Sequence, residues 1–382
     1  MNLLAIKMLM GDKLKYFGLL AGMAFAAMMI AQQASIFVGL KSQTGTFIRE
    51  NASVDLWVMD DQVRFSEDQK PIPDTTLQRI RSIEGVEWAV PMFKGWLRAR
   101  LADGTRMQVI IVGVDDATLI GAPKEFADGV ATDLRRDRAV FMDVRDANTK
   151  LRLEKWETPM RVGDRFSVND NEVIVAGSYR SDPSFFWDPV LYTTYSHAVR
   201  IAPRERHLMS FVLVKVREGV SVAEVQRRIN GQTRFVARTG DEFISMTSAY
   251  ILEKTGILVN FGMAVGLGLI IGMIVTGQTF FNFTLDNLRH FASLKAMGTS
   301  ASTLIRMVVV QVLVVTGLSF GLGVGIASIA GHFIRQTDLA FLMPWQVLVM
   351  TGIAMTVVGM LAAVISLTKV LRLEPGVVFK GG

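Results

Sequence analysis

The side-chain types that most often carry catalysis or bind metals are present but scattered in this 382-residue chain. The histidines form no i,i+4 pair and no H-E-x-x-H motif, and there is no cysteine to supply a thiolate ligand. Solvated turns explain Asp60-Asp61 and Asp115-Asp116 better than acid–base catalysis does. No G-x-x-x-x-G-K-[ST] phosphate loop occurs, so the chain is not expected to hydrolyse ATP. We therefore predict no catalytic residue, no metal site and no cofactor here. The histidines are His197, His207, His290 and His332.

The segment 282–303 has the clearest potential to act on another molecule. Leu288, Phe291 and Leu294 recur there at helical spacing, and Gly298 is a suitable helix terminator. This short amphipathic helix lies directly between two long apolar stretches. A helix in that position can press on a soluble partner at the mouth of a membrane bundle.

Four apolar stretches are each long enough to span a membrane: 17–40, 256–281, 304–331 and 345–367. A hydrocarbon layer of ~30 Å takes roughly 20 helical residues, and an isolated segment satisfies its backbone there only as a helix. The first stretch has an alternative interpretation as a cleaved signal peptide, because Ala24-Phe25-Ala26 resembles a cleavage site. We favour a retained span, since apolar residues continue to Leu40. Residues 1–16 are expected to form an amphipathic helix in the membrane interface.

The distribution of charge predicts how the chain crosses the membrane. Residues 41–254 carry 31 basic and 31 acidic side chains, so the excess of +6 belongs to the other segments. Basic residues precede the first span, lie around the loop 282–303 and follow the last span at 368–382. By the positive-inside rule both termini and that loop are cytoplasmic, whereas 41–255 and the short loop 332–344 lie outside. No basic patch is concentrated in the large insert, so we predict no nucleic-acid partner.

The insert at 41–255 reads as an α+β domain with a second lobe inside it. In its first part, about 50–96, the pattern predicts a strand near Val54–Val58, a helix whose N-cap is Asp74, and a strand at Val86–Pro91. The last part, about 205–250, repeats that order with strands at Phe211–Val216 and Arg234–Ala237 around a helix capped by Ser221. The middle, about 97–200, contains short β segments and turns, which indicates an inserted β-rich lobe.

The membrane spans contain small residues at helical spacing and no mid-membrane charge. Ion- and proton-coupled carriers normally bury ionisable groups there, so a secondary transporter is disfavoured. Glycines at i, i+4 spacing let helices approach closely, in a static interface or in one that slides. The glycines expected to pack in this way are Gly317, Gly321, Gly325, Gly262 and Gly266.

The segment after the second span resembles the coupling helix of the FtsX/MacB family of ABC transporter permeases, whose signature is R-x-x-x-(A/G)-x-L-(K/R)-A-(L/M)-G. Here Arg289 is followed by Ser293-Leu294-Lys295-Ala296-Met297-Gly298. The order of four spans with a large insert after the first is also that family's plan. The tail 371–376 (LRLEPG) and the start of the insert, with Gly85-Val86-Glu87 and Val90-Pro91, are similar to the family as well.

The resemblance implies a non-catalytic permease that is a homodimer with two separate ATPase subunits, which would bind ATP and Mg²⁺. It also implies a porter-like α+β module in the insert, and most closely the DevC branch, which uses an HlyD-like adaptor and an outer-membrane channel. The family often has an acidic residue where this chain has Phe291 and Ala292. The residues implied in the ATPase contact are Arg289, His290, Phe291, Ser293, Leu294, Lys295, Ala296, Met297 and Gly298.

We therefore expect an inner-membrane exporter subunit for amphipathic or hydrophobic molecules, driven by mechanotransmission. The alternatives within the family are a permease that extracts lipoproteins or lipids, a haem exporter, and an FtsX-like regulator of a cell-wall hydrolase. A membrane-anchored sensor without an ATPase is the alternative outside it. The aromatic run Phe185-Phe186-Trp187 is either a surface for an adaptor or ligand, or a hydrophobic plug in a loop.

Overall fold

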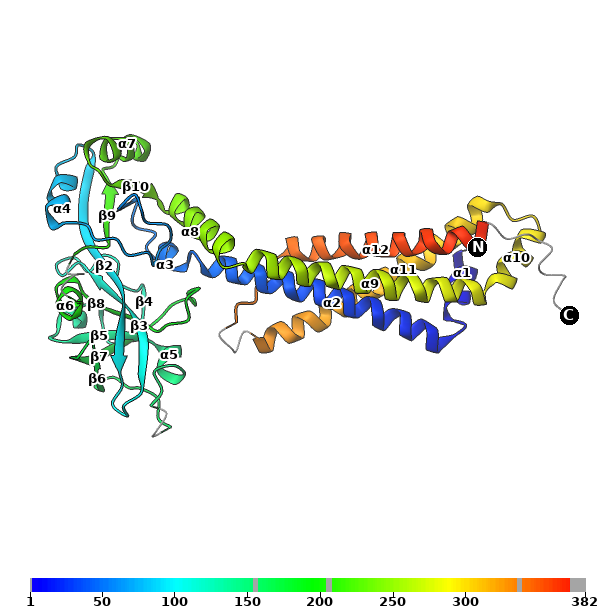
Figure 1. Cartoon of the computed structure of the whole chain (residues 1–382), viewed down its shortest axis with the longest axis horizontal. Helices are drawn as coiled ribbons and strands as arrows, with labels where there is room; N and C mark the ends of the chain where they lie inside the picture. Colours follow the sequence, from blue (N-terminus) through cyan, green and yellow to red (C-terminus); the bar gives the residue numbers. More distant parts are fainter. Residues whose placement is uncertain (1, 154–156, 204–207, 335–338, 372–382) are drawn as a thin grey trace. The chain divides into compact units, whose positions relative to one another are not determined.

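The computed structural model describes residues 2–153, 157–203, 208–334 and 339–371. The chain forms two compact units, one of Met1–Leu40 with Thr255–Gly382 and the other of Lys41–Lys254. We call them the helical unit and the sheet domain (Figure 1). Because the first and last parts of the sequence both belong to the helical unit, the sheet domain is an insertion between its first and second long helices.

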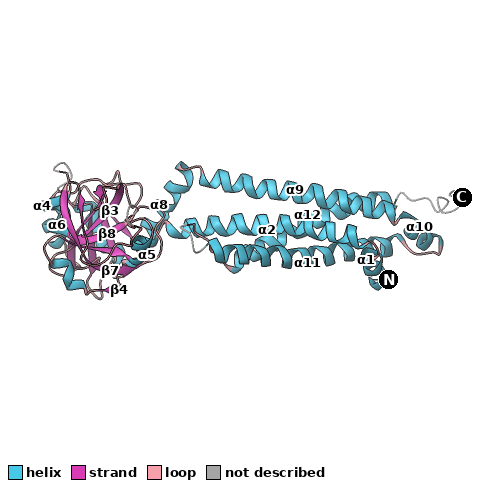
Figure 2. Ribbon diagram, turned by 90° about the horizontal axis from the view of Figure 1, so that it is seen from below, coloured by secondary structure: helices cyan, strands magenta, loops and turns pink. Residues whose placement is uncertain are grey.

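Four helices of the helical unit are long and apolar enough to cross a membrane. They lie alongside one another and share a core in which Met23, Ile30, Val312 and Met355 are buried (Figure 2). The helices extend a few residues beyond most of the predicted apolar stretches, because polar residues outside hydrocarbon can continue the helical hydrogen bonds. The helices of this unit are α1 (Asn2–Met10), α2 (Lys13–Gln43), α9 (Ile257–Asp286), α10 (Leu288–Ala296), α11 (Ala301–Ile334) and α12 (Trp345–Leu371).

The first helix ends earlier than predicted and is not merely interfacial. Helix α1 stops at Met10, and Asp12 then accepts a hydrogen bond from the backbone N–H of Lys15 (3.2 Å) at the start of α2. The prediction of one helix over 1–16 was therefore wrong, since glycine and a capping aspartate divide it. One face of α1 packs on α11, where the Gln311 amide donates to the carbonyl of Ala5 (2.8 Å) in a buried contact.

The described part of the sheet domain contains one ten-stranded sheet, in the order β10-β1-β9-β2-β3-β8-β5-β7-β4, with β6 pairing to β2 and β7. The strands are β1 (Leu56–Met59), β2 (Val86–Arg100), β3 (Arg106–Val114), β4 (Glu125–Asp128), β5 (Ala139–Asp143), β6 (Arg165–Val168), β7 (Asn171–Arg180), β8 (Val190–Thr194), β9 (Phe211–Val216) and β10 (Val236–Thr239). The helices are α3 (Thr46–Glu50), α4 (Asp74–Arg81), the 3₁₀ turn η1 (Ala131–Arg135), α5 (Val144–Asn148), α6 (Tyr195–Ile201), α7 (Val222–Gln232) and α8 (Gly240–Lys254).

Strand β2 joins the two parts of this domain. Its first half, Val86–Met92, pairs with β9, and its second half, Phe93–Arg100, pairs with β3. The β-rich part is therefore continuous with the α+β part through one 15-residue strand, and the expected division near residue 97 falls inside that strand.

Several local predictions in the sheet domain need adjustment. Pro73, not Asp74, is the N-cap of α4, and Asp74 is its first residue, where a carboxylate still favours the positive end of the helix dipole. Ser221 does cap α7, although its side chain makes no capping hydrogen bond. The strand expected at Arg234–Ala237 is shifted to Val236–Thr239, which pairs with β1.

Candidate functional site

Helix α10 follows α9 without an intervening loop. Asn287 is both the C-cap of α9 and the N-cap of α10. Its backbone and side-chain N–H groups both donate to the carbonyl of Phe283 (3.1 and 2.9 Å). Gly298 ends the turn with φ +87°, a conformation that favours glycine, and donates to the carbonyl of Lys295 (3.1 Å). Helix α11 begins three residues later, so α10 is connected tightly at both ends.

One face of α10 is an apolar anchor. The Phe291 side chain is 0% exposed, and Ala292 is buried beside it in the core of the helical unit. Leu288 and Leu294 are partly buried against the same core. A buried phenylalanine contributes about 3–5 kcal/mol relative to alanine, which holds the short helix in place.

The opposite face of α10 is open. Arg289, His290, Ala296 and Gly298 are exposed, and the Met297 side chain is 74% exposed. Ser293 is half-buried and its hydroxyl donates to the carbonyl of Arg289 (2.9 Å), and Lys295 is also half-buried. The residues expected to contact the ATPase therefore fall into two groups. Phe291 and Ala292 lie inside the core, where a partner does not reach them. The others lie at or near the surface.

An ion pair lies beside the junction of α9 and α10. The Lys15 ammonium is 2.5 Å from the carboxylate of Asp286 and 3.4 Å from that of Asp12. All three side chains are about half exposed, so the pairs contribute little to stability. Their effect is to fix the start of α2 next to the end of α9.

A second group of contacts surrounds α3, the first helix of the sheet domain after α2. The Thr44 and Ser248 hydroxyls are 2.6 Å apart in a buried contact, which joins the segment before α3 to α8. The Phe47 ring packs on Trp57, with centroids 5.7 Å apart, and the Lys94 ammonium lies 3.6 Å from the centroid of the Phe47 ring. Both segments by which the chain enters and leaves this domain are thus tied to its core.

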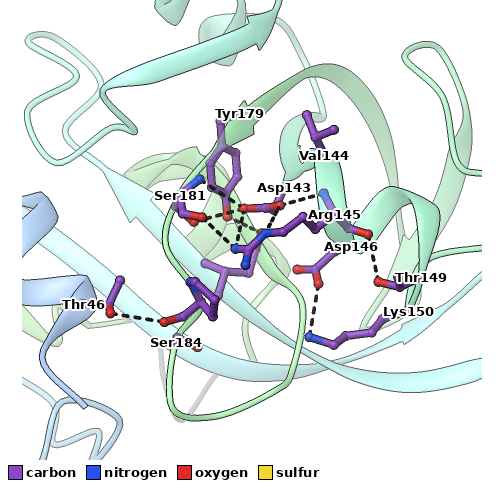
Figure 3. A network of polar contacts seen from close by, with 12 residues as sticks. Thr46, Asp143, Val144, Arg145, Asp146, Thr149, Lys150, Tyr179, Ser181 and Ser184 are labelled. Atoms are coloured by element: carbon purple, nitrogen blue, oxygen red, sulfur yellow. Dashed lines mark hydrogen bonds and ion pairs between the residues drawn. The ribbon is translucent and has the colours of Figure 1, made fainter. Parts of the chain in front are cut away.

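A polar network holds the loop 181–189 between α3 and the β-rich part (Figure 3). Asp143 caps α5 by accepting from the backbone N–H of Arg145 (2.7 Å), and it also accepts from the N–H and hydroxyl of Ser181 (3.2 and 3.1 Å). The Arg145 guanidinium donates to the carbonyl of Ser181 (2.7 Å). On the other side, the Thr46 hydroxyl of α3 donates to the carbonyl of Pro183 (3.1 Å).

The aromatic residues of this loop have different environments. The Phe186 ring packs edge-on against Trp96 and near Phe65, with centroids 5.5 and 5.9 Å apart. The Trp187 side chain is 52% exposed. Phe186 therefore fills the loop as a plug, whereas Trp187 is available on the surface; Phe185 is half-buried and contacts Phe186.

A buried ionisable group contacts α3 and a half-buried one belongs to it. Lys94 forms an ion pair with Glu67 (2.7 Å), and both side chains are nearly inaccessible. Burial lowers the pKa of Lys94, although the Glu67 carboxylate opposes that shift. At the end of α3, burial raises the pKa of Glu50 to about 7, and the nearby carboxylates of Asp182 and Asp143 act in the same direction.

The glycines expected to pack the helices do not do so within the chain. A Cβ added at Gly317, Gly321, Gly325, Gly262 or Gly266 would meet nothing within 4 Å. Gly323 makes the close approach instead, since its added Cβ would lie 2.4 Å from the Ala24 carbonyl oxygen of α2. Positions 321 and 323 differ by about 200° around a helix that turns ~100° per residue, so the predicted glycines of α11 lie on a different face from the one that packs on α2.

Within the described residues, no group of three or more His, Cys, Asp or Glu side chains could hold a metal ion. His197 is buried and its Nδ1 is 2.8 Å from the Thr193 hydroxyl, as expected for a structural histidine. His290 and His332 are exposed, and His207 lies outside the described residues.

Two family profiles match the chain. The profile described as MacB-like periplasmic core domain matches residues 17–232, more than half of the sequence, and the profile described as FtsX-like permease C-terminal matches residues 262–375. The chain belongs to the FtsX/MacB family of ABC transporter permeases. The predicted fold class, four transmembrane helices with an α+β extracytoplasmic domain, is thereby confirmed.

Solved structures similar to this permease cover about half of it. The periplasmic region of MacB from Actinobacillus actinomycetemcomitans is 13% identical, with 54% of this chain and 96% of that chain covered and a TM-score of 0.38. The extracellular domain of the ABC-type transporter YknZ from Gram-positive bacteria is 13% identical, with 49% and 99% covered and a TM-score of 0.36. A domain of a putative permease from Porphyromonas gingivalis is 16% identical, with 49% and 89% covered and a TM-score of 0.32. A comparison with curated protein sequences gave no match.

Helix α10 lies inside the segment matched by the FtsX-like profile, between the spans α9 and α11. Family membership also implies an ABC ATPase partner and a dimer. The family-like tail at 371–376 lies outside the described residues apart from Leu371.

The contacts around α3 were not predicted from the sequence. An N-cap signal was available for Asp143, an aspartate at the end of strand β5. The hydrogen bond from Thr46 to Pro183 joins residues 137 positions apart, and the pairing of Lys94 with Glu67 joins strand β2 to a turn. Neither has a local signature, because both depend on the tertiary fold.

Proposed function

We propose that this chain is the membrane subunit of an ABC exporter whose ATPase is a separate protein that binds ATP and Mg²⁺. The observation that carries the proposal is helix α10, which is anchored by the buried Phe291 and presents Arg289, His290 and Met297 outward. The short connections at both ends mean that a force on α10 reaches α9 and α11 directly. This is the arrangement that a coupling helix requires.

In the proposed cycle, two copies of the chain form a homodimer in the inner membrane with both termini and α10 on the cytoplasmic side. Closure of two ATPase subunits around ATP would press on α10 and tilt the spans. The movement would pass through α2 to α3, which follows it after two residues, and through α9 to α8. The hydrogen bond between Thr44 and Ser248 supports this path, since it makes both connections move together.

We further propose that the sheet domain does its work outside the cytoplasm, on amphipathic or hydrophobic molecules that need not cross the bilayer through the helices. In this scheme it acts with an HlyD-like adaptor and an outer-membrane channel, as in the DevC branch. The absence of Asp, Glu, Lys and Arg from Ile257–Phe281, Met307–Gly331 and Trp345–Thr368 supports transport outside the bilayer.

The test is affinity purification of the tagged chain from its native membrane, followed by mass spectrometry of the proteins that accompany it. An ATPase together with an HlyD-like adaptor is the expected result. An ATPase with a cell-wall hydrolase would replace export with hydrolase regulation, and recovery of no ATPase would contradict the coupling function of α10.

We propose that the exposed Trp187, in the loop 181–189, belongs to the surface that binds the adaptor. Because Trp187 is exposed and Phe186 holds the loop, Trp187→Ala should weaken adaptor recovery several-fold and leave thermal unfolding unchanged. Phe186→Ala is the matched comparison, since loss of its packing should lower the unfolding temperature. Normal adaptor recovery by Trp187→Ala would remove this residue from the interface.

A further inference from the structure

Three arginines lie together on one face of the sheet domain, on the paired strands β2 and β3 (Figure 1). Arg100 is directly opposite Arg106 in the ladder, and Arg98 is opposite Gln108. All three arginines are exposed. Since opposite residues of an antiparallel pair share a face, their guanidinium groups lie on the same side of the sheet.

These arginines line a cleft with a volume of about 600 Å³, together with Gln108, Ser167 and Asn169. That volume lies within the range of sites that bind small or segmental ligands. The cleft is bounded on one side by the β6–β7 turn, where Asn169 and Asp170 have positive φ values of 49° and 63°. The Asn169 N–H donates to the carbonyl of Arg98 (2.7 Å), which holds the turn against β2.

None of the three arginines has an ion-pair partner in the described part of the chain. Arginines nearby do: Glu172 pairs with Arg138 and, at 3.6 Å, with Arg165. Asp170 is the one carboxylate among the residues that line the cleft, and it forms no ion pair with the arginines. The positive charge is local, because residues 41–254 carry equal numbers of basic and acidic side chains.

Arg100 opposite Arg106 is an unfavourable arrangement for stability alone. Like charges directly opposite in an antiparallel ladder destabilise it, whereas opposite charges stabilise it by about 0.2–1 kcal/mol. A bound anion would reverse the sign of this contribution. The guanidinium fork matches carboxylate geometry with two parallel hydrogen bonds, so three arginines suit several carboxylates at once.

We propose that this arginine cleft binds the carboxylates of an acidic segment of an extracytoplasmic partner protein. A protein segment fits better than a lipid, because the lining is polar and charged apart from Ala99 and Met107, and Ala99 is buried. The identity of the partner as a protein outside the cytoplasm rests on the proposed function, whereas anion binding by the cleft does not.

The experiment measures binding of a 12-residue peptide of alternating Glu and Ser to the full chain in nanodiscs of zwitterionic lipid, by calorimetry. The Gln-Ser peptide is the neutral control. Each exposed charge pair is worth up to about 1 kcal/mol, so R98Q/R100Q/R106Q should weaken binding of the Glu-Ser peptide roughly tenfold or more. The control R79Q/R217Q/R227Q removes three exposed charges elsewhere in the sheet domain and should change the affinity less than about twofold.

Equal losses in the two triple variants, or no binding by the wild type, would overturn the proposal. Inorganic phosphate, or phosphatidylglycerol nanodiscs, could bind more tightly than the Glu-Ser peptide with the same dependence on these arginines. The ligand of the cleft would then be a phosphate or a lipid headgroup, which would overturn the assignment of a protein segment. None of these variants touches α10, so ATPase recovery tests the proposed function separately.

Arg106→Thr distinguishes a binding role from a structural one. Removal of the like-charge contact with Arg100 should leave the unfolding temperature unchanged or raise it, while binding of the Glu-Ser peptide falls. A fall in both would mean that Arg106 supports the strand and would contradict the proposal.

Discussion

Different kinds of interaction stabilise the helical unit and the sheet domain, each within itself. In the helical unit, glycine and alanine allow close backbone contact, as at Gly323 against Ala24, and few side-chain hydrogen bonds join the long helices. In the sheet domain, a buried ion pair and a network around Asp143 join segments far apart in sequence. Smooth contacts between small residues permit small shifts, whereas directional polar contacts fix position. The helical unit therefore depends on close packing of small residues, and the sheet domain depends on directional polar contacts.

The largest effect should come from breaking the Lys94–Glu67 pair. Lys94→Met leaves a buried carboxylate without its partner, which should lower the free energy of unfolding by about 3–5 kcal/mol. The double variant K94M/E67L removes both charges and should recover most of that loss. Thermal unfolding of the solubilised chain measures both. If the single and double variants are equally unstable, the pair matters through shape and not through charge.

The next largest effect should be a difference in stability between substitutions on two faces of α11. In Gly323→Ala the new Cβ meets the backbone of α2, so the helices must separate at a cost of about 1–3 kcal/mol. Gly321→Ala meets nothing within the chain and gains up to about 1 kcal/mol of helix propensity.

Unfolding temperatures that move in opposite directions would support this assignment. The fraction of dimer should be measured on the same samples, because loss of dimer in Gly321→Ala would place a second copy on that face. A destabilised, still dimeric Gly321→Ala would contradict the open environment of Gly321.

A third effect should depend on pH. The folded chain keeps a proton on Glu50 up to about pH 7, whereas the unfolded chain releases it near the ordinary value of 4.5. The folded state therefore binds more protons between these values and loses stability as the pH rises through 7. Glu50→Gln abolishes that loss and should be more stable than the wild type at pH 8 by about 2 kcal/mol, allowing for partial solvent screening.

At pH 4.5 the two proteins should unfold at nearly the same temperature. Asp182→Asn is a useful companion, since removal of one neighbouring carboxylate should lessen the pH dependence without abolishing it. A difference between Glu50→Gln and the wild type that is independent of pH would contradict the account of Glu50.

The parts of the fold that depend on local patterns were predictable. Apolar length identified the four spans, and the apolar run Phe211–Val216 matches the bounds of β9. The short strands β4 and β8 were missed, because Glu125–Asp128 is polar and Val190–Thr194 follows a proline-rich loop without a clear period. Helix α8 was also missed, since its buried face becomes clear only when Phe243 packs on Trp57 and Phe211.

The candidate site was predictable in position and less so in orientation. The spacing of Leu288, Phe291 and Leu294 located α10, and Gly298 located its end. Which residues face a partner depends on how the helix lies against α9 and α11, so the burial of Ala292 was not foreseen. The glycines at i, i+4 spacing remain a prediction for a contact outside this chain, because the pattern does not say which helix will cover that face.

The most direct test of the central claim is charge reversal on α10, at the exposed Arg289 and the half-buried Lys295. Arg289→Glu with Lys295→Glu leaves the Phe291 anchor intact and reverses the charge presented to the ATPase, and Arg79→Glu with Arg227→Glu on the sheet domain is the matched control. ATPase recovery with the tagged chain should fall at least tenfold in the α10 variant, remain normal in the control, and leave the unfolding temperature of both unchanged. Normal recovery of an active ATPase by the α10 variant would contradict the assignment of α10 as the coupling helix.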